Sequence, residues 1–362
     1  MKNRLATPGP AMVPNSILLA GAQEPIHHRS AEMKTIMEEI GTDLKDIFQT
    51  QSDIYVQLSS GTGGMEAAVA NCFQPGDRVI VVNNGYFGQR FVELCEIYQL
   101  NVVQVSSDWG TAINVDDVEN KLDADPSIKG IFVVYSETST GVLNDVQRLA
   151  QLCHHRNALL IVDAISALLT QPLPMELWGV DVVIAASHKG FMMPPGLVFF
   201  SVSEKAWKAV ESNPERSYYF SYRRFRQFYP LAPSSPAVSL IFSLRESLNL
   251  LKQEGFSNVI ERHQNVAKFV SSELEKIGFR NVVERESDRN SVISVLETPQ
   301  GVDPAKLRKL LSENYNITVT DGQGPFKGKV IRFGHIGAMD KFEVGSYLRA
   351  IEEQVNHLKE NQ

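Results

Sequence analysis

Two polar residues at the ends of apolar runs, Asp163 and Lys189, are the side chains of this 362-residue chain whose positions point most directly to chemistry. Asp163 ends the apolar run over residues 160–163, and Lys189 follows the run over residues 180–186. A third apolar run covers residues 197–202. Short runs of this kind predict buried strands. Because neighbouring parallel strands bring their carboxyl ends to one edge of a sheet, we expect the carboxylate and the amine to meet there.

An amine and a carboxylate at one sheet edge meet two demands of pyridoxal phosphate chemistry. The amine condenses with the aldehyde of the cofactor. The carboxylate keeps the ring nitrogen protonated, so that the ring can accept electrons from a carbanion. The alternatives are a solvated surface lysine and an aspartate that caps a helix over residues 164–169. The position of Lys189 between a buried strand and Gly190 favours the cofactor role.

A glycine-rich turn offers a place for the phosphate of such a cofactor. Residues 59–64 (SSGTGG) follow a predicted strand over residues 54–58 and precede a predicted helix over residues 65–73. A strand, a glycine-rich turn and a helix together present N–H groups and the positive end of the helix dipole to an anion. The turn is neither a Walker loop nor a GxGxxG motif. An ordinary glycine-rich turn is the alternative.

Arg332 is the candidate for binding the carboxylate of an amino acid. It lies in the apolar strand predicted over residues 330–334, and a half-buried arginine needs an anionic partner. That partner is either a substrate or a carboxylate in a structural salt bridge. His188, beside Lys189, faces the cofactor or packs in the core. The eight histidines and three cysteines show no metal-binding spacing, so we expect no metal site.

Strands and helices alternate from residue 54 to residue 202, which predicts an α/β fold with a mostly parallel central sheet and helices on both faces. Two helices follow over residues 238–278, broken at Gly255. The later elements are shorter and predict a small α+β domain. We therefore expect an N-terminal arm over residues 1–20, a large cofactor-binding domain over residues 21–255 and a small C-terminal domain over residues 256–362.

The composition narrows the class of partner. Lys and Arg number 35 against 42 Asp and Glu, a net charge of −7, which argues against nucleic acid or an anionic membrane as the main partner. The aromatic and basic segment over residues 218–229 favours a subunit interface or a site wall over a nucleic-acid surface. No apolar run approaches the roughly 18 residues of a membrane helix, and no secretory signal is visible. We expect a cytoplasmic enzyme.

Nine segments in a fixed order resemble one known family. The chain is similar nearly from end to end to the class V aminotransferases, which have the type I fold of pyridoxal-phosphate enzymes. Within them it resembles the alanine–glyoxylate, serine–pyruvate and serine–glyoxylate aminotransferases and the small subunit of cyanobacterial soluble hydrogenase. The segments are TPGP, HHRS, SSGTGGMEAA, NNGYFGQR, ETSTGVL, LLIVDAISAL, SHKGFMMPPG, SLRESLNLL and GQGPFKGKVIRFGHIG.

The resemblance assigns roles to single residues. It implies that Lys189 bonds to pyridoxal 5′-phosphate and moves protons, that Asp163 meets the ring nitrogen, and that Arg332 holds the substrate carboxylate. The other implied cofactor-binding residues are Thr62, Gly63 and Gly64 for the phosphate, Phe87 for stacking on the ring, Thr138 and Ser139 beside the cofactor oxygen, His188 near the phosphate, and Ser235 for the phosphate in a neighbouring subunit.

The resemblance also implies an activity and an assembly. The expected reaction is ping-pong transfer of an amino group from alanine or serine to glyoxylate or pyruvate, in a homodimer with shared active sites. Aspartate stays open as donor, since Arg29 could serve a second carboxylate, and a non-catalytic subunit of a larger complex is a further alternative. A cysteine desulfurase is excluded, because its chemistry needs a nucleophilic cysteine late in the chain and the last cysteine is Cys153.

Overall fold

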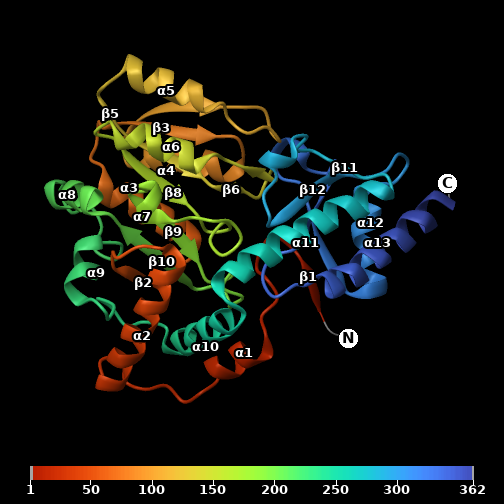
Figure 1. Cartoon of the computed structure of the whole chain (residues 1–362), viewed down its shortest axis with the longest axis horizontal. Helices are drawn as coiled ribbons and strands as arrows, with labels where there is room; N and C mark the ends of the chain where they lie inside the picture. The colour runs from red at the N-terminus through yellow and green to blue at the C-terminus, as the bar shows by residue number, and fades with distance from the viewer. Residues whose placement is uncertain (1–2, 361–362) are drawn as a thin grey trace.

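The computed structural model describes residues 3–360. Within this part of the chain the largest sheet has seven strands in the order β2-β10-β9-β8-β5-β3-β4 (Figure 1). Their bounds are β2 (Ile54–Leu58), β3 (Arg78–Asn83), β4 (Asn101–Ser106), β5 (Ile128–Val134), β8 (Leu159–Asp163), β9 (Val182–Ala186) and β10 (Leu197–Val202). Neighbouring strands are parallel except at β10, which is antiparallel to both β9 and β2. The predicted mostly parallel sheet is confirmed.

Helices cover both faces of this sheet, as predicted. Alternate residues of a strand point to opposite faces, so Val79 and Val81 of β3 pack in one core and Ile80 and Val82 in the other. The first core is completed by α3 (Gly61–Cys72), α4 (Tyr86–Ile97), α8 (Glu204–Ser212) and α9 (Tyr222–Phe228). The second is completed by α2 (Ala31–Phe48), α5 (Val115–Ala124), α6 (Val146–His154), α7 (Met175–Trp178) and α10 (Val238–Glu254).

A smaller sheet forms the other lobe of the molecule. Its strand order is β1-β13-β14-β12-β11, with the bounds β1 (Arg4–Ala6), β13 (Ile317–Asp321), β14 (Val330–Gly334), β12 (Ile293–Glu297) and β11 (Arg280–Asn281). The helices that share its core are α11 (Phe256–Lys276), α12 (Pro304–Tyr315) and α13 (Lys341–Glu360). Two 3-10 helices, η1 (Glu286–Asp288) and η2 (Gly324–Phe326), lie in its loops. This part is α+β, as predicted.

The N-terminal arm joins the two lobes. Its strand β1 pairs in parallel with β13, with Leu5 opposite Thr318, and Figure 1 shows this red strand beside the blue end of the chain. The following helix α1 (Asn15–Gly21) packs against α10 of the large lobe. Residues between them run past the edge of the large sheet, where the Ala11 N–H donates to the His188 carbonyl. The domain boundaries at residues 20 and 255 stay a prediction.

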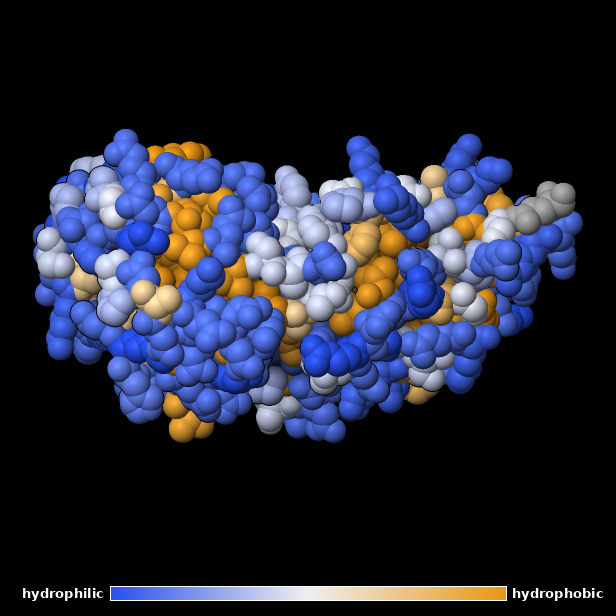
Figure 2. All heavy atoms as spheres, turned by 90° about the horizontal axis from the view of Figure 1, so that it is seen from above, coloured by the Kyte–Doolittle hydropathy of each residue, from blue (hydrophilic) through white to orange (hydrophobic). Residues whose placement is uncertain are grey.

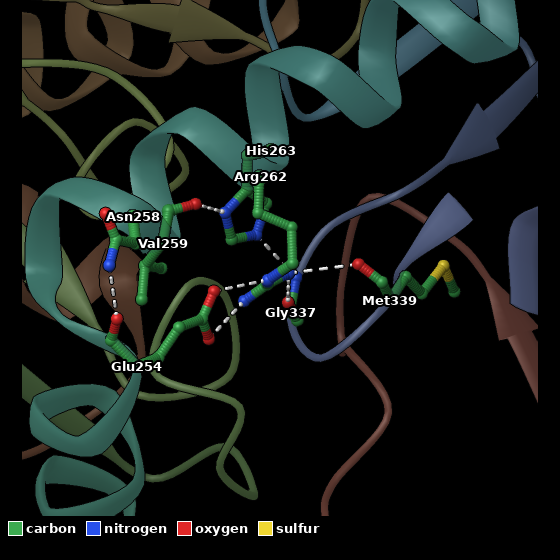
Figure 3. A network of polar contacts seen from close by, with 7 residues as sticks. All are labelled: Glu254, Asn258, Val259, Arg262, His263, Gly337 and Met339. Atoms are coloured by element: carbon green, nitrogen blue, oxygen red, sulfur yellow. Dashed lines mark hydrogen bonds and ion pairs between the residues drawn. The ribbon is translucent and has the colours of Figure 1, made fainter. Parts of the chain in front are cut away.

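A polar network fixes the junction between α10 and α11, which meet at Gly255 with a φ of +89°. Figure 3 shows Arg262 reaching back to both carboxylate oxygens of Glu254, at 2.6 and 3.1 Å, and across to the carbonyls of Gly337 and Met339. The neighbouring His263 lies between the Val259 carbonyl, 2.7 Å from Nδ1, and the Gly337 N–H, 3.0 Å from Nε2. The network ties the long helix to the loop after β14.

The molecular surface is mostly hydrophilic on the face drawn in Figure 2, where apolar atoms gather in narrower areas on both lobes. Among the helices between residues 3 and 360, none is both long and apolar enough to span a bilayer. The same residues contain no cluster of three or more His, Cys, Asp or Glu side chains that could hold a metal ion.

Candidate active site

A cavity of about 170 Å³ lies where the ends of β8 and β9 meet the start of α3. Parallel strands place their carboxyl ends, and the loops that follow them, at one edge of the sheet. Six of the residues expected in the site line this cavity: Thr62, Phe87, Thr138, Asp163, His188 and Lys189. The topology therefore brings together side chains from the ends of five different strands.

Asp163 and Lys189 are both buried in this cavity, with 4% and 8% of their surface exposed. The Lys189 amine donates to the carbonyl of Pro8, 2.7 Å away, and Asp163 Oδ1 accepts from the Ile165 N–H at 2.8 Å. The backbone bond holds the carboxylate in place at the end of β8, and its other oxygen accepts no hydrogen bond from residues 3–360. The amine and the carboxylate thus form the floor of the cavity.

Burial brings the pKa values of Asp163 and Lys189 closer to neutral pH. It raises the pKa of Asp163 from 3.8 to about 7, and the charge of Glu137 adds to this, whereas Lys189 and Arg90 oppose it. Burial lowers the pKa of Lys189 from 10.5 to about 8, against the pull of Asp163. A carboxyl group with so high a pKa lacks a sufficient cationic partner. A protonated ring nitrogen would be such a partner, and an amine with this pKa can both accept and release a proton.

The first turn of α3 presents its backbone to the cavity. Its N-cap, Ser60, makes no side-chain capping bond, whereas the N-caps of α2, α6 and α8 each accept a bond from their first turn. The helix begins at Gly61, four residues earlier than expected, and close packing explains the glycines of its first turn. A Cβ at Gly61 would lie 2.5 Å from Ile165, and one at Gly64 would lie 2.7 Å from Ile184. N–H groups at an uncapped helix start suit an anion.

Gly63 and Gly64 serve the packing of α3 more than the cavity wall. Their N–H groups lie 3.0 and 3.4 Å from the carbonyl of Ser60, and a Cβ at Gly63 would lie 2.0 Å from the Ser59 hydroxyl. Neither residue is among those that line the cavity, whereas Ser60 and Gly61 are. The glycine-rich turn therefore meets the cavity mainly through Ser60, Gly61 and Thr62.

Two polar atoms at the cavity wall have no hydrogen-bond partner within the described chain, His188 Nδ1 and Ser136 Oγ. Burial, followed by the charge of Lys189, lowers the pKa of His188 to about 4, so the imidazole is neutral at pH 7. Buried polar groups are rarely left unpaired, since each costs roughly 1–3 kcal/mol. Both atoms therefore point to a polar ligand in the cavity.

The loop between β6 (Ser136–Glu137) and β7 (Val142–Leu143) contributes one residue to the cavity and another to hydrogen bonds that hold neighbouring elements together. Thr138 lines the cavity. Ser139 instead donates to Glu137 at 2.6 Å and accepts from the Tyr86 N–H at 2.9 Å. The fully buried Glu137 carboxylate also accepts from the N–H groups of Phe87 and Gly88, both at 3.0 Å, so it caps α4 and sets the position of the Phe87 ring.

Arg332 lies on β14 beside the cavity loop, with 8% of its surface exposed. It donates to the carbonyl of Asp321 at 2.6 Å, to that of Thr138 at 3.2 Å and to Gln323 Oε1 at 2.9 Å. Burial lowers its pKa to about 10, so it stays charged at neutral pH. Thr138 thus joins the arginine to the cavity, although Arg332 is not itself among the cavity-lining residues.

Ser235 stands apart from the other expected residues. It is exposed in the loop between α9 and α10 and is not among the residues that line the cavity. Two other residues, Glu137 and Arg90, belong to the site although no role was expected for them. Arg90 lines the cavity and donates to Thr62 Oγ1 at 2.9 Å. Their signal in the sequence was their place in the strand-end segments ETSTGVL and NNGYFGQR.

Comparison with known proteins agrees with this arrangement. The family model described as aminotransferase class-V matches residues 11–344. The chain is 36% identical to the soluble hydrogenase small subunit of Synechococcus sp., with 97% of this chain and 92% of that protein covered. It is 30% identical to the serine–glyoxylate aminotransferase of Arabidopsis thaliana, with 97% and 90% covered.

The chain belongs to the class V aminotransferases. The solved structure of the alanine–glyoxylate aminotransferase from Nostoc sp. superimposes on it with a TM-score of 0.93 at 29% identity, covering 98% of this chain and 96% of that one. The expected fold of pyridoxal-phosphate enzymes is thereby confirmed. A cysteine desulfurase from Thermococcus onnurineus shares the fold at 16% identity. The three cysteines of this aminotransferase are buried, and burial raises the pKa of each thiol. A buried thiol with a raised pKa does not suit the role of a nucleophile.

Proposed function

We propose that this aminotransferase binds pyridoxal phosphate in the cavity and moves an amino group from a small amino acid, alanine or serine, to a small 2-oxo acid, glyoxylate or pyruvate. The observation that carries the proposal is the burial of Asp163 and Lys189 in one cavity. The names of relatives support the substrate class: besides the Arabidopsis enzyme, an alanine–glyoxylate aminotransferase of Felis catus is 30% identical over 99% of this chain.

The residues of the cavity fit the cofactor group by group. The uncapped first turn of α3, with the hydroxyl of Thr62, suits a phosphate. The unpartnered atoms Ser136 Oγ and His188 Nδ1 supply polar contacts that the protein leaves open. Phe87 offers an aromatic face. Bound there, pyridoxal phosphate would act as the electron sink that lets the α-carbon of an amino acid lose its proton.

The chain's own residues would then act in three ways. Lys189 Nζ, with a pKa near 8, would take the proton from the α-carbon of the amino acid and deliver it to the cofactor carbon that carried the aldehyde oxygen. Asp163 pairs with the positively charged ring nitrogen of the cofactor, and that positive charge in turn keeps the Asp163 carboxylate ionised. Arg332 exchanges its bond to Gln323 for the carboxylate of the substrate, because a charged acceptor binds a guanidinium more strongly than an amide does.

A second copy of the chain would complete the site. Ser235 is exposed and the aromatic segment nearby carries exposed rings, with Tyr218 75% and Tyr219 45% exposed. Exposed aromatic side chains are typical of subunit interfaces. We propose that they pack in a homodimer and that Ser235 approaches the phosphate end of the partner's cavity.

Replacing the cavity lysine tests the proposal directly. Lys189→Ala should abolish both turnover and the visible absorbance of bound cofactor, because the amine that bonds to the aldehyde is gone. The control is Lys129→Ala, which removes an exposed lysine on β5 that pairs with Asp77. An unchanged spectrum in Lys189→Ala would contradict the proposal.

Adding single amino acids to the purified enzyme identifies the donor. Alanine or serine should bleach the visible band of the bound cofactor, and glyoxylate or pyruvate should restore it. Aspartate is the second candidate, because an L-aspartate–glyoxylate aminotransferase of Paracoccus denitrificans is 32% identical over 93% of this chain. Bleaching by aspartate alone would replace the proposed donor, and an absence of any visible band would favour a non-catalytic subunit.

A further inference from the structure

Arg90 occupies a corner of the candidate site between two aromatic rings. Its guanidinium carbon lies 4.9 Å from the centroid of Phe87 and 5.3 Å from that of Tyr86, and the two rings meet edge to face. One of its N–H groups donates to Thr62 Oγ1 at 2.9 Å. A single side chain on α4 therefore contacts both the ring that faces the cavity and the hydroxyl at the start of α3.

The charge of Arg90 has no carboxylate partner within ion-pair distance in the described part of the chain, unlike the half-buried Arg262, Arg289 and Arg308. Arg90 also lines the cavity, beside the uncapped turn that suits an anion. A partly desolvated cation without a counter-charge is costly. A negatively charged ligand in the cavity would remove that cost.

The bond from Arg90 also sets the direction of the Thr62 hydroxyl. Because Thr62 Oγ1 accepts from the guanidinium, its own hydrogen is free to donate elsewhere. The cavity beside it is where such a donor would meet a phosphate oxygen. Arg90 supports the Phe87 ring from the same position through a cation–π contact.

We propose that Arg90 is a positioning residue for the phosphate of the cofactor: it orients the Thr62 hydroxyl, braces the Phe87 ring and adds positive charge at that end of the cavity. The inference rests on the proposed cofactor site and adds a residue to it. In support, the charge of Arg90 also lowers the pKa of Asp163, against the effect of burial. Its hydrogen bond to Thr62 is the part of this action that a second substitution can isolate.

The test compares two probes that differ only in the phosphate. Dissociation constants of pyridoxal phosphate and of pyridoxal are measured by absorbance titration of cofactor-free protein, for wild type, Arg90→Met and Arg90→Gln. We expect Arg90→Met to raise the dissociation constant of pyridoxal phosphate about tenfold or more, because a charge-assisted contact is lost. The dissociation constant of pyridoxal should change less than threefold. Arg90→Gln, which keeps a donor for Thr62, should fall between.

A double-mutant cycle then tests the route through the hydroxyl. The effects of Thr62→Ala and Arg90→Met on the free energy of pyridoxal phosphate binding should be non-additive. The double variant should bind pyridoxal phosphate about as weakly as the single variant that binds it less well. Arg78→Met, which removes an exposed arginine on β3 paired with Asp125, is the matched control and should leave both constants unchanged. If Arg90→Met does not fold, Arg90→Lys serves in its place, with a smaller loss in the same direction.

The outcomes separate the two proposals. Wild-type protein that binds neither probe would overturn the cofactor site itself. Wild-type protein that binds pyridoxal phosphate, with Arg90 variants that bind it equally well or that weaken both probes equally, would overturn only the role of Arg90.

Discussion

The amine of Lys189 donates a hydrogen bond to the carbonyl oxygen of Pro8, 2.7 Å away, although 181 residues separate them in the chain. The next residue, Gly9, has a φ of +141° and lies against the same amine, so that a Cβ there would be 2.4 Å from Lys189 Nζ. The N-terminal arm is therefore a wall of the candidate site. The segment TPGP does more than extend the chain over the surface.

A methyl group at position 9 should displace the Lys189 amine. We expect Gly9→Ala to lower turnover at least about tenfold and to weaken cofactor binding, because the added Cβ collides with Nζ and the backbone conformation is costly for alanine. Gly76→Ala is the control: its φ is +86°, but a Cβ there meets nothing within 4 Å. Steady-state kinetics and absorbance titration measure both variants, and equal losses in the two would show that backbone strain alone is responsible.

Replacing Arg332 on β14 with lysine should weaken substrate binding without affecting cofactor binding. In Arg332→Lys the planar fork that spans Asp321, Thr138 and Gln323 is lost. A charged hydrogen bond contributes about 1.5–3 kcal/mol, so KM for the amino donor should rise roughly 10- to 100-fold. Arg280→Lys changes an exposed arginine paired with Glu297 and should leave KM unchanged. An unaltered KM in Arg332→Lys would assign Arg332 a purely structural role.

The buried His263 should make stability depend on acid pH. Burial lowers its folded-state pKa from 6.5 to about 3, so between these values the unfolded chain binds one more proton than the folded one. The free energy of unfolding therefore falls as pH falls from 6.5, by at most about 1.4 kcal/mol per pH unit for each such histidine. When the free energy of unfolding is measured by urea denaturation at pH 4 to 7, its dependence on pH should be shallower for His263→Gln than for wild type.

The matched control for this effect is His155→Gln, which replaces an exposed histidine at the end of α6. Its slope should equal that of wild type. His188 and His335, whose pKa values burial also lowers to about 4, remain in both variants, so part of the acid sensitivity persists. A His263→Gln slope equal to that of wild type would show that His263 takes up no proton on unfolding in this range.

Local pattern predicted the large sheet well. The strands β2, β10 and β14 have the predicted ends and β8 ends at Asp163 as predicted, because each is an apolar run closed by a polar residue or a turn. The break between α10 and α11 falls at Gly255, as expected for the residue with the weakest helix preference in that stretch. The meeting of Asp163 and Lys189 in one cavity followed from topology, since Asp163 ends β8 and Lys189 follows its parallel neighbour β9.

Features that depend on distant residues were not predictable in this way. The glycines in the first turn of α3 make room for Ile165 at Gly61 and for Ile184 at Gly64, and neither isoleucine is near in sequence. The pairing of β1 with β13 has no local signal either. Part of the aromatic segment, residues 222–228, forms α9, since the rings of Tyr222 and Phe225 are buried in the core shared with β10 and α8, which overrides an indifferent helix pattern.

The parallel pairing of Arg4–Ala6 with Ile317–Val319 has a consequence for the order of synthesis. The first strand has no partner in its own sheet until the ribosome has made more than 300 residues. Until then the segment that follows it, which meets Lys189 through Pro8, is fixed at one end only, where α1 packs against α10. The arm that meets Lys189 is therefore fixed at both ends only after β13 has been made, late in translation, and only then is the candidate site complete.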